Sequence, residues 1–328
     1  MKVREIGEQG LLKRLQSFCV PGMLGDDAAV IATPPGEQLV VTTDMLVDGV
    51  HFSDRTTPPE AAGWRAVAAN LSDLAAMGAT PLGITVGLSL TGETEVAWVE
   101  QLYTGMRECL QRYDSGILGG DIVRSPLKAI SITALGSAPL ERIIRRNAAQ
   151  PGDAIVVTGV HGSSRAGLEL LLHPEKGENL TQSDRHSLIQ AHQRPQPRLD
   201  ILPLLWDILP SQSAIAGMDS SDGLADAIIQ ICQTSNTGAS IDRNLIPLSP
   251  ALTQLVPPPQ ALQWALYGGE DFELVLCLPP QVAQQFVQRL PTATPIGKIT
   301  PETEISLVDP QKKYPDEPLS LNRGFQHF

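Results

Sequence analysis

The stretch LVVTTDMLVDGVHF, residues 39–52, determines how the first half of the chain folds. Its opening residues, 39–43, are apolar or β-branched, a composition typical of a β-strand. We expect this strand to end at Asp44, where the apolar run stops. A carboxylate at the end of an apolar strand is costly unless another group satisfies its charge. The stretch therefore predicts a strand that delivers an acid to a site.

The segments that follow carry further helical and strand patterns. Apolar residues at helical spacing predict helices over 59–77 and 94–113, and apolar or β-branched runs predict strands over 83–90, 116–118 and 129–135. Several of these strands lie next to one another without a helix between them. This order favours an α+β fold, with mixed sheets covered by helices, over a doubly wound parallel sheet.

A change in composition over residues 136–152 predicts a domain boundary. We place an N-terminal domain at 1–140 and a C-terminal domain at 141–328. In the second domain we expect strands at 154–158 and 273–278, helices at 166–172 and 225–232, an ordered proline-rich connection at 194–198 and an exposed loop at 257–259.

Length and charge limit the function classes. The 328 residues fit two domains, and the formal net charge of -12 argues against a nucleic-acid partner. The N-terminal sequence does not have the pattern of a signal peptide, and no apolar run is long enough to span a bilayer. The four cysteines are far apart and form no CxxC pair, as expected of reduced thiols. We therefore predict a cytoplasmic protein with neither nucleic-acid nor membrane partners.

Acidic residues recur in six segments beside strand ends or glycine-rich turns. They are GDDAAV (25–30), TD (43–44), SDL (72–74), GGD (119–121), DSSDG (219–223) and GGED (268–271). Any one of these segments alone is explained more simply by a helix cap, a turn or a solvated acid. Six together, flanked by small residues that let a ligand approach the backbone, indicate a site.

The acids also indicate which ions bind there. Carboxylates that are brought together repel one another, and their pKa values rise unless cations are present. Oxygen ligands with neighbouring hydroxyls (Thr42, Thr43, Ser221) select Mg²⁺, Mn²⁺ or Ca²⁺ over Zn²⁺ or Cu²⁺. Because Mg²⁺ often completes its shell with phosphates, the acids predict several metal ions and a phosphorylated substrate. The sequence has no P-loop, GxGxxG, GxSxG or HExxH motif.

Six motifs together resemble the thiamine-monophosphate kinase family. They are GDDAAV (25–30), TTDMLVDGVHF (42–52), NLSDLAAMGATPLG (70–83), GGD (119–121), MDSSDGL (218–224) and YGGEDFEL (267–274), in the family's order over almost the whole chain. The resemblance implies a two-domain fold like that of aminoimidazole-ribonucleotide synthetase. It implies a homodimer whose N-terminal strands form a barrel at the interface. It also implies phosphorylation of thiamine monophosphate to thiamine diphosphate by ATP.

The resemblance further implies roles for individual residues. The ligands of several Mg²⁺ ions would be Asp27, Thr42, Thr43, Asp44, Asp73, Asp121, Asp219 and Asp222, with K⁺ as a further candidate ion. Tyr103, Gly120, Asp121, Arg146 and Ser221 would contact ATP, and His51, Glu270 and Phe325 would contact the thiamine substrate. Domain 1–140 would bind metal and ATP and form the dimer, and domain 141–328 would complete the nucleotide and substrate site.

Two details qualify these roles. Ala148 replaces the glycine usual in the family's Arg-x-Gly-Ala stretch, so the choice of Arg146 over Arg145 at the phosphates depends on this position. No side chain is assigned as nucleophile or base, because the attacking phosphate oxygen of the substrate is already anionic and transfer would be direct. Arg146 would offset charge on the transferred group.

Three other functions compete with this one. Selenophosphate synthetase would need a reactive cysteine with a lysine nearby, whereas Cys19 has no lysine beside it. A magnesium-dependent phosphatase often has a DPxDGT-type segment, which this sequence lacks. A non-catalytic sensor of divalent ions or nucleotides remains open. An assay for ADP that appears only with thiamine monophosphate would separate all three.

Overall fold

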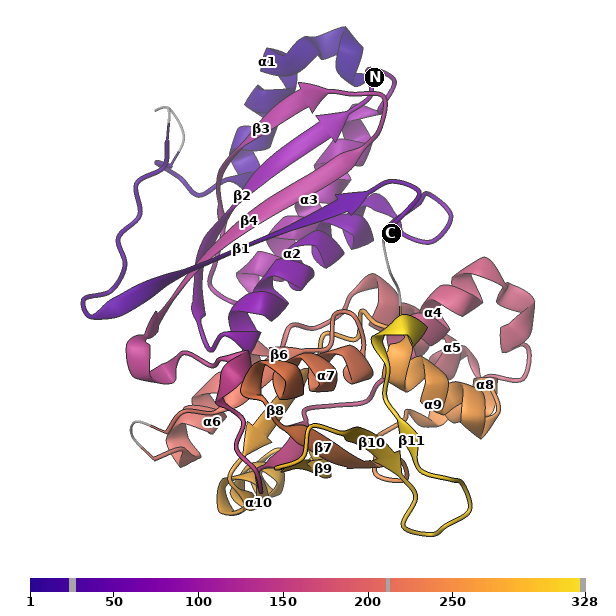
Figure 1. Ribbon diagram of the computed structural model, residues 1–328. Coiled ribbons are helices and arrows are strands. Elements are labelled where there is room, and N and C mark those ends of the chain that lie inside the picture. Colours follow the sequence, from indigo (N-terminus) through magenta and orange to yellow (C-terminus); the bar gives the residue numbers. More distant parts are fainter. Residues whose placement is uncertain (24–27, 211–212, 325–328) are drawn as a thin grey trace. The chain divides into compact units, whose positions relative to one another are not determined.

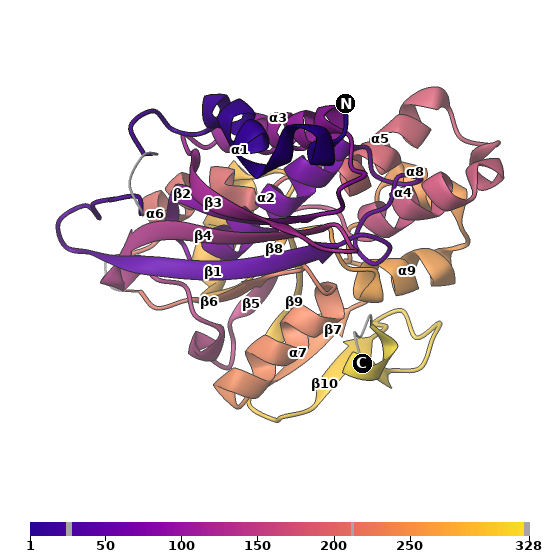
Figure 2. The same cartoon turned by 90° about the horizontal axis from the view of Figure 1, so that it is seen from above.

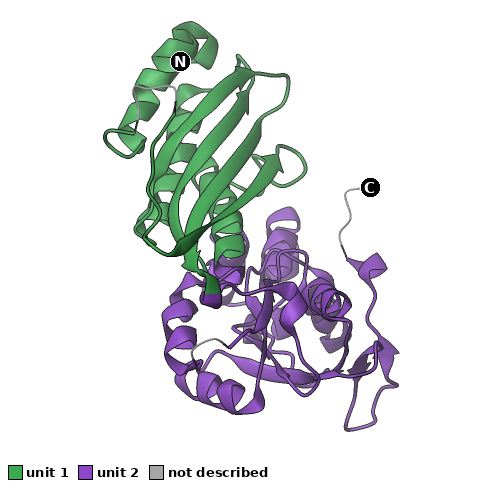
Figure 3. Cartoon of the chain, turned by 60° about the vertical axis from the view of Figure 1, so that its left-hand side comes forward, with its two compact units in different colours: residues 1–74, 79–140 green, residues 75–78, 141–328 purple. Residues whose placement is uncertain are grey.

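The computed structural model describes residues 1–23, 28–210 and 213–324 of the chain. The predicted site residues Asp27 and Phe325 lie outside these residues. The chain forms two compact units, coloured separately in Figure 3. Unit 1 comprises Met1–Leu74 and Ala79–Leu140, and unit 2 comprises Ala75–Gly78 and Glu141–Phe328.

Unit 1 is a four-stranded mixed sheet with helices (Figure 1). Its elements are α1 (Val3–Leu15), η1 (Gln16–Phe18), β1 (Glu37–Val47), α2 (Pro59–Ala76, which continues into unit 2), β2 (Thr80–Leu90), α3 (Val96–Gln111), β3 (Ile117–Arg124) and β4 (Ala129–Pro139). The strand order is β1-β4-β2-β3, so β1 and β3 are the two edges. β4 pairs antiparallel with both β1 and β2, whereas β3 runs parallel to β2.

Helices α2 and α3 cover one face of this sheet (Figures 1 and 2). On that face the β4 side chains Ile130 and Ile132 are fully buried. The helices cross closely because both have a glycine at the contact. A Cβ on Gly63 would lie 1.9 Å from the Leu102 carbonyl oxygen, and one on Gly105 would lie 1.8 Å from the carbonyl oxygen of Glu60. Only glycine permits this approach.

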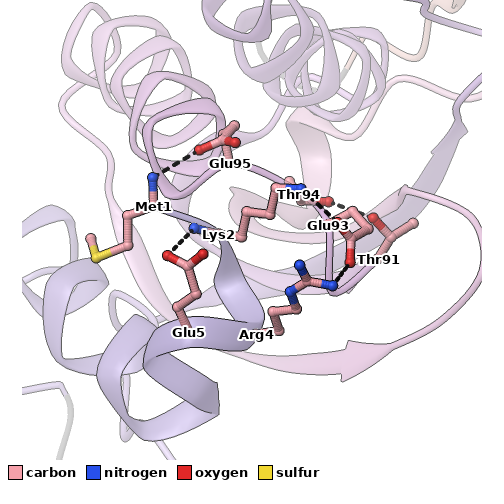
Figure 4. Close-up of polar contacts among 8 residues, drawn as sticks. All are labelled: Met1, Lys2, Arg4, Glu5, Thr91, Glu93, Thr94 and Glu95. Atoms are coloured by element: carbon pink, nitrogen blue, oxygen red, sulfur yellow. Dashed lines mark hydrogen bonds and ion pairs between the residues drawn. The ribbon is translucent and has the colours of Figure 1, made fainter.

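The N-terminus of unit 1 is tied to the loop before α3 (Figure 4). Residues 1–4 run antiparallel to residues 92–96 through backbone hydrogen bonds. The Met1 ammonium group is 3.1 Å from Glu95 Oε2, and Glu93 pairs with basic side chains of the first four residues. Exposed ion pairs stabilise weakly, about 0–1 kcal/mol each, so the backbone pairing makes the main contribution. This contact fixes the start of α1.

Unit 2 is built on a seven-stranded mixed sheet with the order β11-β10-β7-β9-β5-β8-β6. Its strands are β5 (Ala154–Val157), β6 (Ala216–Asp219), β7 (Gly238–Asp242), β8 (Leu274–Leu278), β9 (Thr294–Thr300), β10 (Ile305–Val308) and β11 (Glu317–Pro318). Its α-helices are α4 (Ser163–Leu172), α5 (Gln182–Gln193), α6 (Leu202–Ile208), α7 (Leu224–Ser235), α8 (Pro250–Leu255), α9 (Pro258–Tyr267) and α10 (Pro280–Arg289). Its 3₁₀ turns are η2 (Leu140–Arg142, beginning in unit 1), η3 (Arg146–Ala148), η4 (Pro174–Gly177), η5 (Arg198–Ile201) and η6 (Leu321–Arg323).

The core of unit 2 forms between its sheet and α7. Ile228 and Ile231 of α7 pack with Val275 of β8, an interior strand next to the edge strand β6, in one buried cluster. All five residues of β8 are buried, as expected of a strand covered on both faces. Since β6 ends at Asp219 and β8 begins just after the GGED segment, this core positions the predicted acids.

The structure corrects three sequence-based predictions. β1 does not end at Asp44 but continues to Val47. The GGD segment is not a turn but lies inside β3, which extends to Arg124 because pairing with β2 outweighs the low strand propensity of glycine. The proline run 257–259 is exposed as expected, yet Pro258 begins α9. Proline suits a first helical turn, where its missing N–H has no partner to lose.

Among the described residues, no helix is both long and apolar enough to cross a membrane. Cys19, Cys109, Cys232 and Cys277 are all free thiols.

Candidate active site

A polar cluster lies between β1 and α2 on the helix-covered face of the unit 1 sheet. Thr42 Oγ1 donates a hydrogen bond to Asp73 Oδ2, and the Asp44 backbone N–H donates to Asn70 Oδ1 at 3.2 Å. Thr42 and Asp44 are two residues apart on β1 and share a face, as do Asn70 and Asp73, three apart on α2. Asn70 is fully buried and also donates to the Ala66 carbonyl. The cluster presents two carboxylates and a hydroxyl together.

Thr43 and Asp121 lie on the opposite face of the same sheet. Thr43 pairs with Thr133 across the strands, and its hydroxyl donates to the Ile132 carbonyl at 2.8 Å. Asp121 pairs with Gly87, in the same cross-strand row as Met45 rather than Asp44. Strand alternation therefore separates these side chains from the Thr42–Asp44–Asp73 group.

A cavity of about 200 Å³ lies at edge strand β3 and brings together three predicted ATP contacts, Tyr103, Gly120 and Asp121. Its remaining lining comes from α1, η1, Cys19 and three further residues of β3, Ile117, Gly119 and Ile122. Tyr103 is 4% exposed. Burial raises the pKa of its phenol, and the electrostatic effect of nearby Cys19 raises it further. Gly120 has no room for a side chain, since a Cβ there would lie 2.1 Å from the Val86 carbonyl oxygen.

His51 follows β1 in a tight turn of unit 1. Its Nδ1 accepts a hydrogen bond from the backbone N–H of Val47 at 3.1 Å. Its carbonyl oxygen accepts one from buried Arg65 at 3.3 Å. Because Nδ1 is an acceptor, the neutral ring carries its proton on Nε2. Nε2–H is thus a donor of fixed orientation.

In unit 2, two predicted segments meet backbone to backbone. β6 ends at Asp219, which is 2% exposed and accepts a hydrogen bond from Ser221 Oγ at 3.1 Å. The Glu270 N–H donates to the Ser221 carbonyl at 2.6 Å. Gly269 has φ 66°, and a Cβ there would lie 2.8 Å from the same carbonyl. The structure therefore brings Asp219, Ser221 and Glu270 to one place.

Arg146 belongs to a polar chain along the start of α7. Its Nη1 donates to Gln230 Oε1 at 2.6 Å, and Gln230 donates to Asp226 Oδ2 at 2.7 Å. Burial raises the pKa of Asp226, and the charge of Asp222 raises it further, whereas Gln230 and Arg146 lower it. The charges of Arg146 and of the predicted metal ligand Asp222 therefore both act on Asp226.

Asp271, the last residue of the GGED turn, is partly buried and caps α4. Its two carboxylate oxygens accept hydrogen bonds from the backbone N–H groups of Gly162 (2.7 Å) and Ser164 (2.9 Å). Helix N-termini favour negative charge, and these bonds stabilise the carboxylate. Burial has the larger opposite effect and raises the pKa of Asp271 to about 7.

This raised pKa makes stability depend on pH. The folded protein binds the Asp271 proton more tightly than the unfolded chain, where the pKa is near 3.8. The contribution of this carboxyl group to stability should therefore fall as the pH rises from about 4 to about 7, then stay constant. The measurement is the free energy of unfolding between pH 5 and 8 for the wild type and Asp271→Asn. The difference between the two proteins should change below pH 7 and level off above it, and a constant difference would contradict the prediction.

The donor set fits hard divalent cations. Thr42, Asp44 and Asp73 supply hydroxyl and carboxylate oxygens on one face, the chemistry that Mg²⁺ prefers. Among the described residues, no three His, Cys, Asp or Glu side chains form a group around one point. Asp219 and Asp222 belong to unit 2, and Asp27 lies outside the described residues. Neither unit by itself supplies the whole predicted set.

Sequence reasoning did not assign three residues that the structure places at these positions. Asn70 accepts a hydrogen bond from the Asp44 backbone, Asp226 is linked to Arg146 through Gln230, and Asp271 ties the GGED turn to the start of α4. Asn70 had a signal, since the NLSD motif puts it one helical turn before Asp73. Asp226 also had one, four residues after Asp222. Asp271 was part of an identified segment, but its role as a cap depends on α4, more than a hundred residues away.

Comparison with known proteins places the chain in a family. Residues 25–138 match the model of the AIR synthase related protein N-terminal domain, and residues 150–310 match that of the C-terminal domain. The thiamine-monophosphate kinase of Synechococcus elongatus is 51% identical over 330 residues, covering 99% of this chain and 97% of the relative. That of Escherichia coli is 40% identical, covering 78% and 76%.

Solved structures agree with this placement. The crystal structure of thiamine-monophosphate kinase from Stenotrophomonas maltophilia has a TM-score of 0.78 and 34% identity, covering 90% of this chain and 94% of that one. AaThiL complexed with AMPPCP and TMP has a TM-score of 0.74 and 32% identity, covering 97% and 98%. With both domain models matched and relatives aligned over nearly its whole length, the chain belongs to the thiamine-monophosphate kinase family of enzymes, with the two-domain AIR synthase related fold.

Proposed function

We propose that this protein transfers the γ-phosphoryl group of ATP to thiamine monophosphate, forming thiamine diphosphate. The observation that carries the proposal is the likeness to AaThiL, a relative solved with AMPPCP and TMP, over 97% of this chain. The polar clusters of both units support it, since they supply the oxygen ligands, positive charge and cavity that such a reaction needs. The free thiols agree with a cytoplasmic enzyme.

Several Mg²⁺ ions are proposed to be held by Asp27, Thr42, Thr43, Asp44, Asp73, Asp121, Asp219 and Asp222. When bound, Mg²⁺ neutralises phosphate charge and aligns the reacting groups. The chain's own residues prepare these positions. Thr42 orients Asp73 by a hydrogen bond, Asn70 holds the backbone of Asp44, and Ser221 orients Asp219.

ATP is proposed to contact Tyr103, Gly120 and Asp121 in unit 1 and Arg146 and Ser221 in unit 2. The cavity at β3 supports the first three, because it combines apolar walls with the Tyr103 ring and an open carboxylate. Arg146 supplies a planar cation suited to phosphate oxygens.

Thiamine monophosphate is proposed to contact His51, Glu270 and Phe325. The orientation of His51 is fixed by its bond to Val47. The end of the described chain supports Phe325, since a Cβ on Gly324 would lie 3.9 Å from the Asp222 carbonyl oxygen. The substrate phosphate is anionic at neutral pH and can attack directly, so the proposal needs no general base and no phosphoenzyme.

A coupled assay tests the proposal. Purified protein with ATP and Mg²⁺ should release ADP only when thiamine monophosphate is present, and thiamine diphosphate should accumulate in equal amount. Release of ADP without thiamine monophosphate would indicate an ATPase, and release of inorganic phosphate from thiamine monophosphate would indicate a phosphatase. Either result would contradict the proposal.

We also propose that the protein is a homodimer joined through the outer face of the unit 1 sheet, where strands of two copies would form a barrel. The outward side chains of edge strand β1, Leu39, Val41 and Met45, are apolar and 51–57% exposed. An unpaired edge strand with an exposed apolar face is a typical association site. A second copy of this chain offers the same surface, as a two-fold interface requires.

Lysine at position 41 should therefore abolish the dimer, because it would place a charge in the buried interface. Sedimentation velocity should give twice the 35.2 kDa chain mass for the wild type and the single mass for Val41→Lys. Leu245→Lys is the matched control, since Leu245 is an apolar residue of unit 2 with a similar exposure of 46%. A monomeric wild type, or a dimeric Val41→Lys, would contradict this interface.

A further inference from the structure

The GGED turn of unit 2 and the residue that follows it include two non-glycine residues with left-handed backbone conformations. Glu270 has φ 59° and Phe272 has φ 54°. Such conformations are unfavourable for residues with a side chain, especially an aromatic one, and persist when the surroundings enforce them. The backbone therefore sets the direction in which the Glu270 side chain leaves the turn.

Two sets of hydrogen bonds hold the GGED turn, one to the start of α4 and one to Ser221. Asp271 accepts the N–H groups at the start of α4, and the Glu270 N–H donates to the Ser221 carbonyl. The first set involves the side chain of Asp271 and the second the backbone of Glu270. Neither determines where the Glu270 carboxylate itself points.

A separate segment contacts the side chains of Glu270 in the turn and of Glu273 just after it. His192, near the end of α5, has its Nδ1 at 3.7 Å from Glu270 Oε2 and 3.2 Å from Ser164 Oγ. Six residues later, Arg198 Nη1 donates to Glu273 Oε2 at 2.6 Å. The residues between them include the two prolines of the 194–198 connection, which restrict its backbone.

The side chain of His192 is buried, whereas that of Glu270 is partly exposed. The His192 side chain is 3% exposed, whereas that of Glu270 is 35% exposed. The imidazole thus lies as a buried, fixed group against one side of a carboxylate that remains partly accessible. An ionised carboxylate favours a proton on the facing Nδ1, because a lone pair there would repel it.

We infer that His192 is a positioning residue that orients the carboxylate of Glu270 toward thiamine monophosphate. The inference rests on the proposed function, in which Glu270 contacts this substrate. Ser164 Oγ of α4 contacts the same Nδ1 atom at 3.2 Å, which keeps this ring atom in place where it faces the carboxylate. A positioned carboxylate suits the polar, positively charged ring system of thiamine, and a small displacement of such a group is costly to binding.

The contact with Glu270 is made by Nδ1 of His192, so variants that replace Nδ1 or Nε2 separately can test it. In His192→Asn the side-chain amide can occupy the place of Nδ1, whereas in His192→Gln it reaches the place of Nε2. His186→Gln is the matched control, since His186 is an exposed residue of the same helix. Each protein is measured for the KM of both substrates, for thiamine monophosphate binding by calorimetry and for its melting temperature.

We expect His192→Gln to raise the KM and Kd for thiamine monophosphate about tenfold, with the KM for ATP within about twofold of the wild type. His192→Asn should recover most of this loss, and His186→Gln should behave as the wild type. In a Glu270→Gln background, His192→Gln should add little, because the carboxylate on which it acts is already removed.

Other outcomes would overturn the inference. Equal losses for both substrates together with a lower melting temperature would show that His192 only packs the core. Equal defects in His192→Asn and His192→Gln would exclude a contact through Nδ1, and fully additive effects with Glu270→Gln would exclude action through that residue. An active wild type with an unaffected His192→Gln would overturn this inference alone, whereas a wild type that neither binds nor phosphorylates thiamine monophosphate would overturn the proposed function as well.

Discussion

Replacing either Asp44 or Asp73 with asparagine is expected to lower turnover by at least about a hundredfold, as the loss of a main electrostatic element does. The two carboxylates come from a strand and a helix that face each other, and both are held by neighbouring polar groups. Asparagine keeps the volume but removes the negative charge that would bind Mg²⁺. The fold should remain, so the loss should appear in kcat and in the dependence of the rate on Mg²⁺ concentration.

Asp54→Asn is the matched control, because Asp54 lies in the same unit with its side chain 80% exposed. It should keep nearly full activity. The variants at positions 44 and 73 should keep the melting temperature of the wild type within a few degrees. Turnover close to that of the wild type in both, at saturating Mg²⁺, would remove these residues from the metal site.

The sequence predicted most elements of unit 1 and placed them in a two-domain α+β fold with mixed sheets, which the structure and the family models confirm. Period-2 and period-3.6 patterns were strong there because each element buries one face. The prediction was wrong where local propensity and tertiary pairing disagree. Two glycines interrupt β3, and an aspartate interrupts β1, yet both strands continue because neighbouring strands supply their hydrogen bonds.

The site residues were named by motif, and their roles remain predictions. What the sequence could not give was the face on which each side chain lies. Thr42, Thr43 and Asp44 are consecutive, but alternation along β1 puts Thr43 on the other side of the sheet. A strand predicted to end at Asp44 hides this separation, since a residue beyond a strand end can turn in any direction.

His192 illustrates a second limit. The sequence shows only that His192 precedes a proline-rich connection and lies 78 positions before Glu270. The contact exists because the start of α4 supports both the imidazole, through Ser164, and the GGED turn, through Asp271. No local pattern reports a relation that depends on three distant segments.

The second large effect is expected at Arg198, which forms a largely buried ion pair with Glu273, two residues after the GGED turn. The two side chains are 11% and 17% exposed, and Nη1 lies 2.6 Å from Oε2. Nη1 also donates to the Thr158 carbonyl, and Thr158 Oγ1 donates to Glu273. Burial raises the pKa of Glu273, and Arg198 partly offsets this rise. Burial lowers the pKa of Arg198, but its hydrogen bonds and charge interactions with Asp200 and Glu273 have the larger effect, so the pKa of Arg198 is raised. Each charge therefore depends on its partner.

Arg198→Met should lower the free energy of unfolding by about 3–5 kcal/mol, because Glu273 would remain buried without a compensating charge. Denaturant unfolding followed by circular dichroism measures this change. Arg289→Met is the matched control, since Arg289 pairs with Asp207 at the same 2.6 Å but with side chains 48% and 65% exposed. Its loss should cost no more than about 1 kcal/mol. The double variant Arg198→Met/Glu273→Met should recover much of the loss, because it removes both buried charges together. If Arg198→Met cost no more than Arg289→Met, or if the double variant were less stable than Arg198→Met alone, the pair would not depend on mutual compensation and this account of the turn would be wrong.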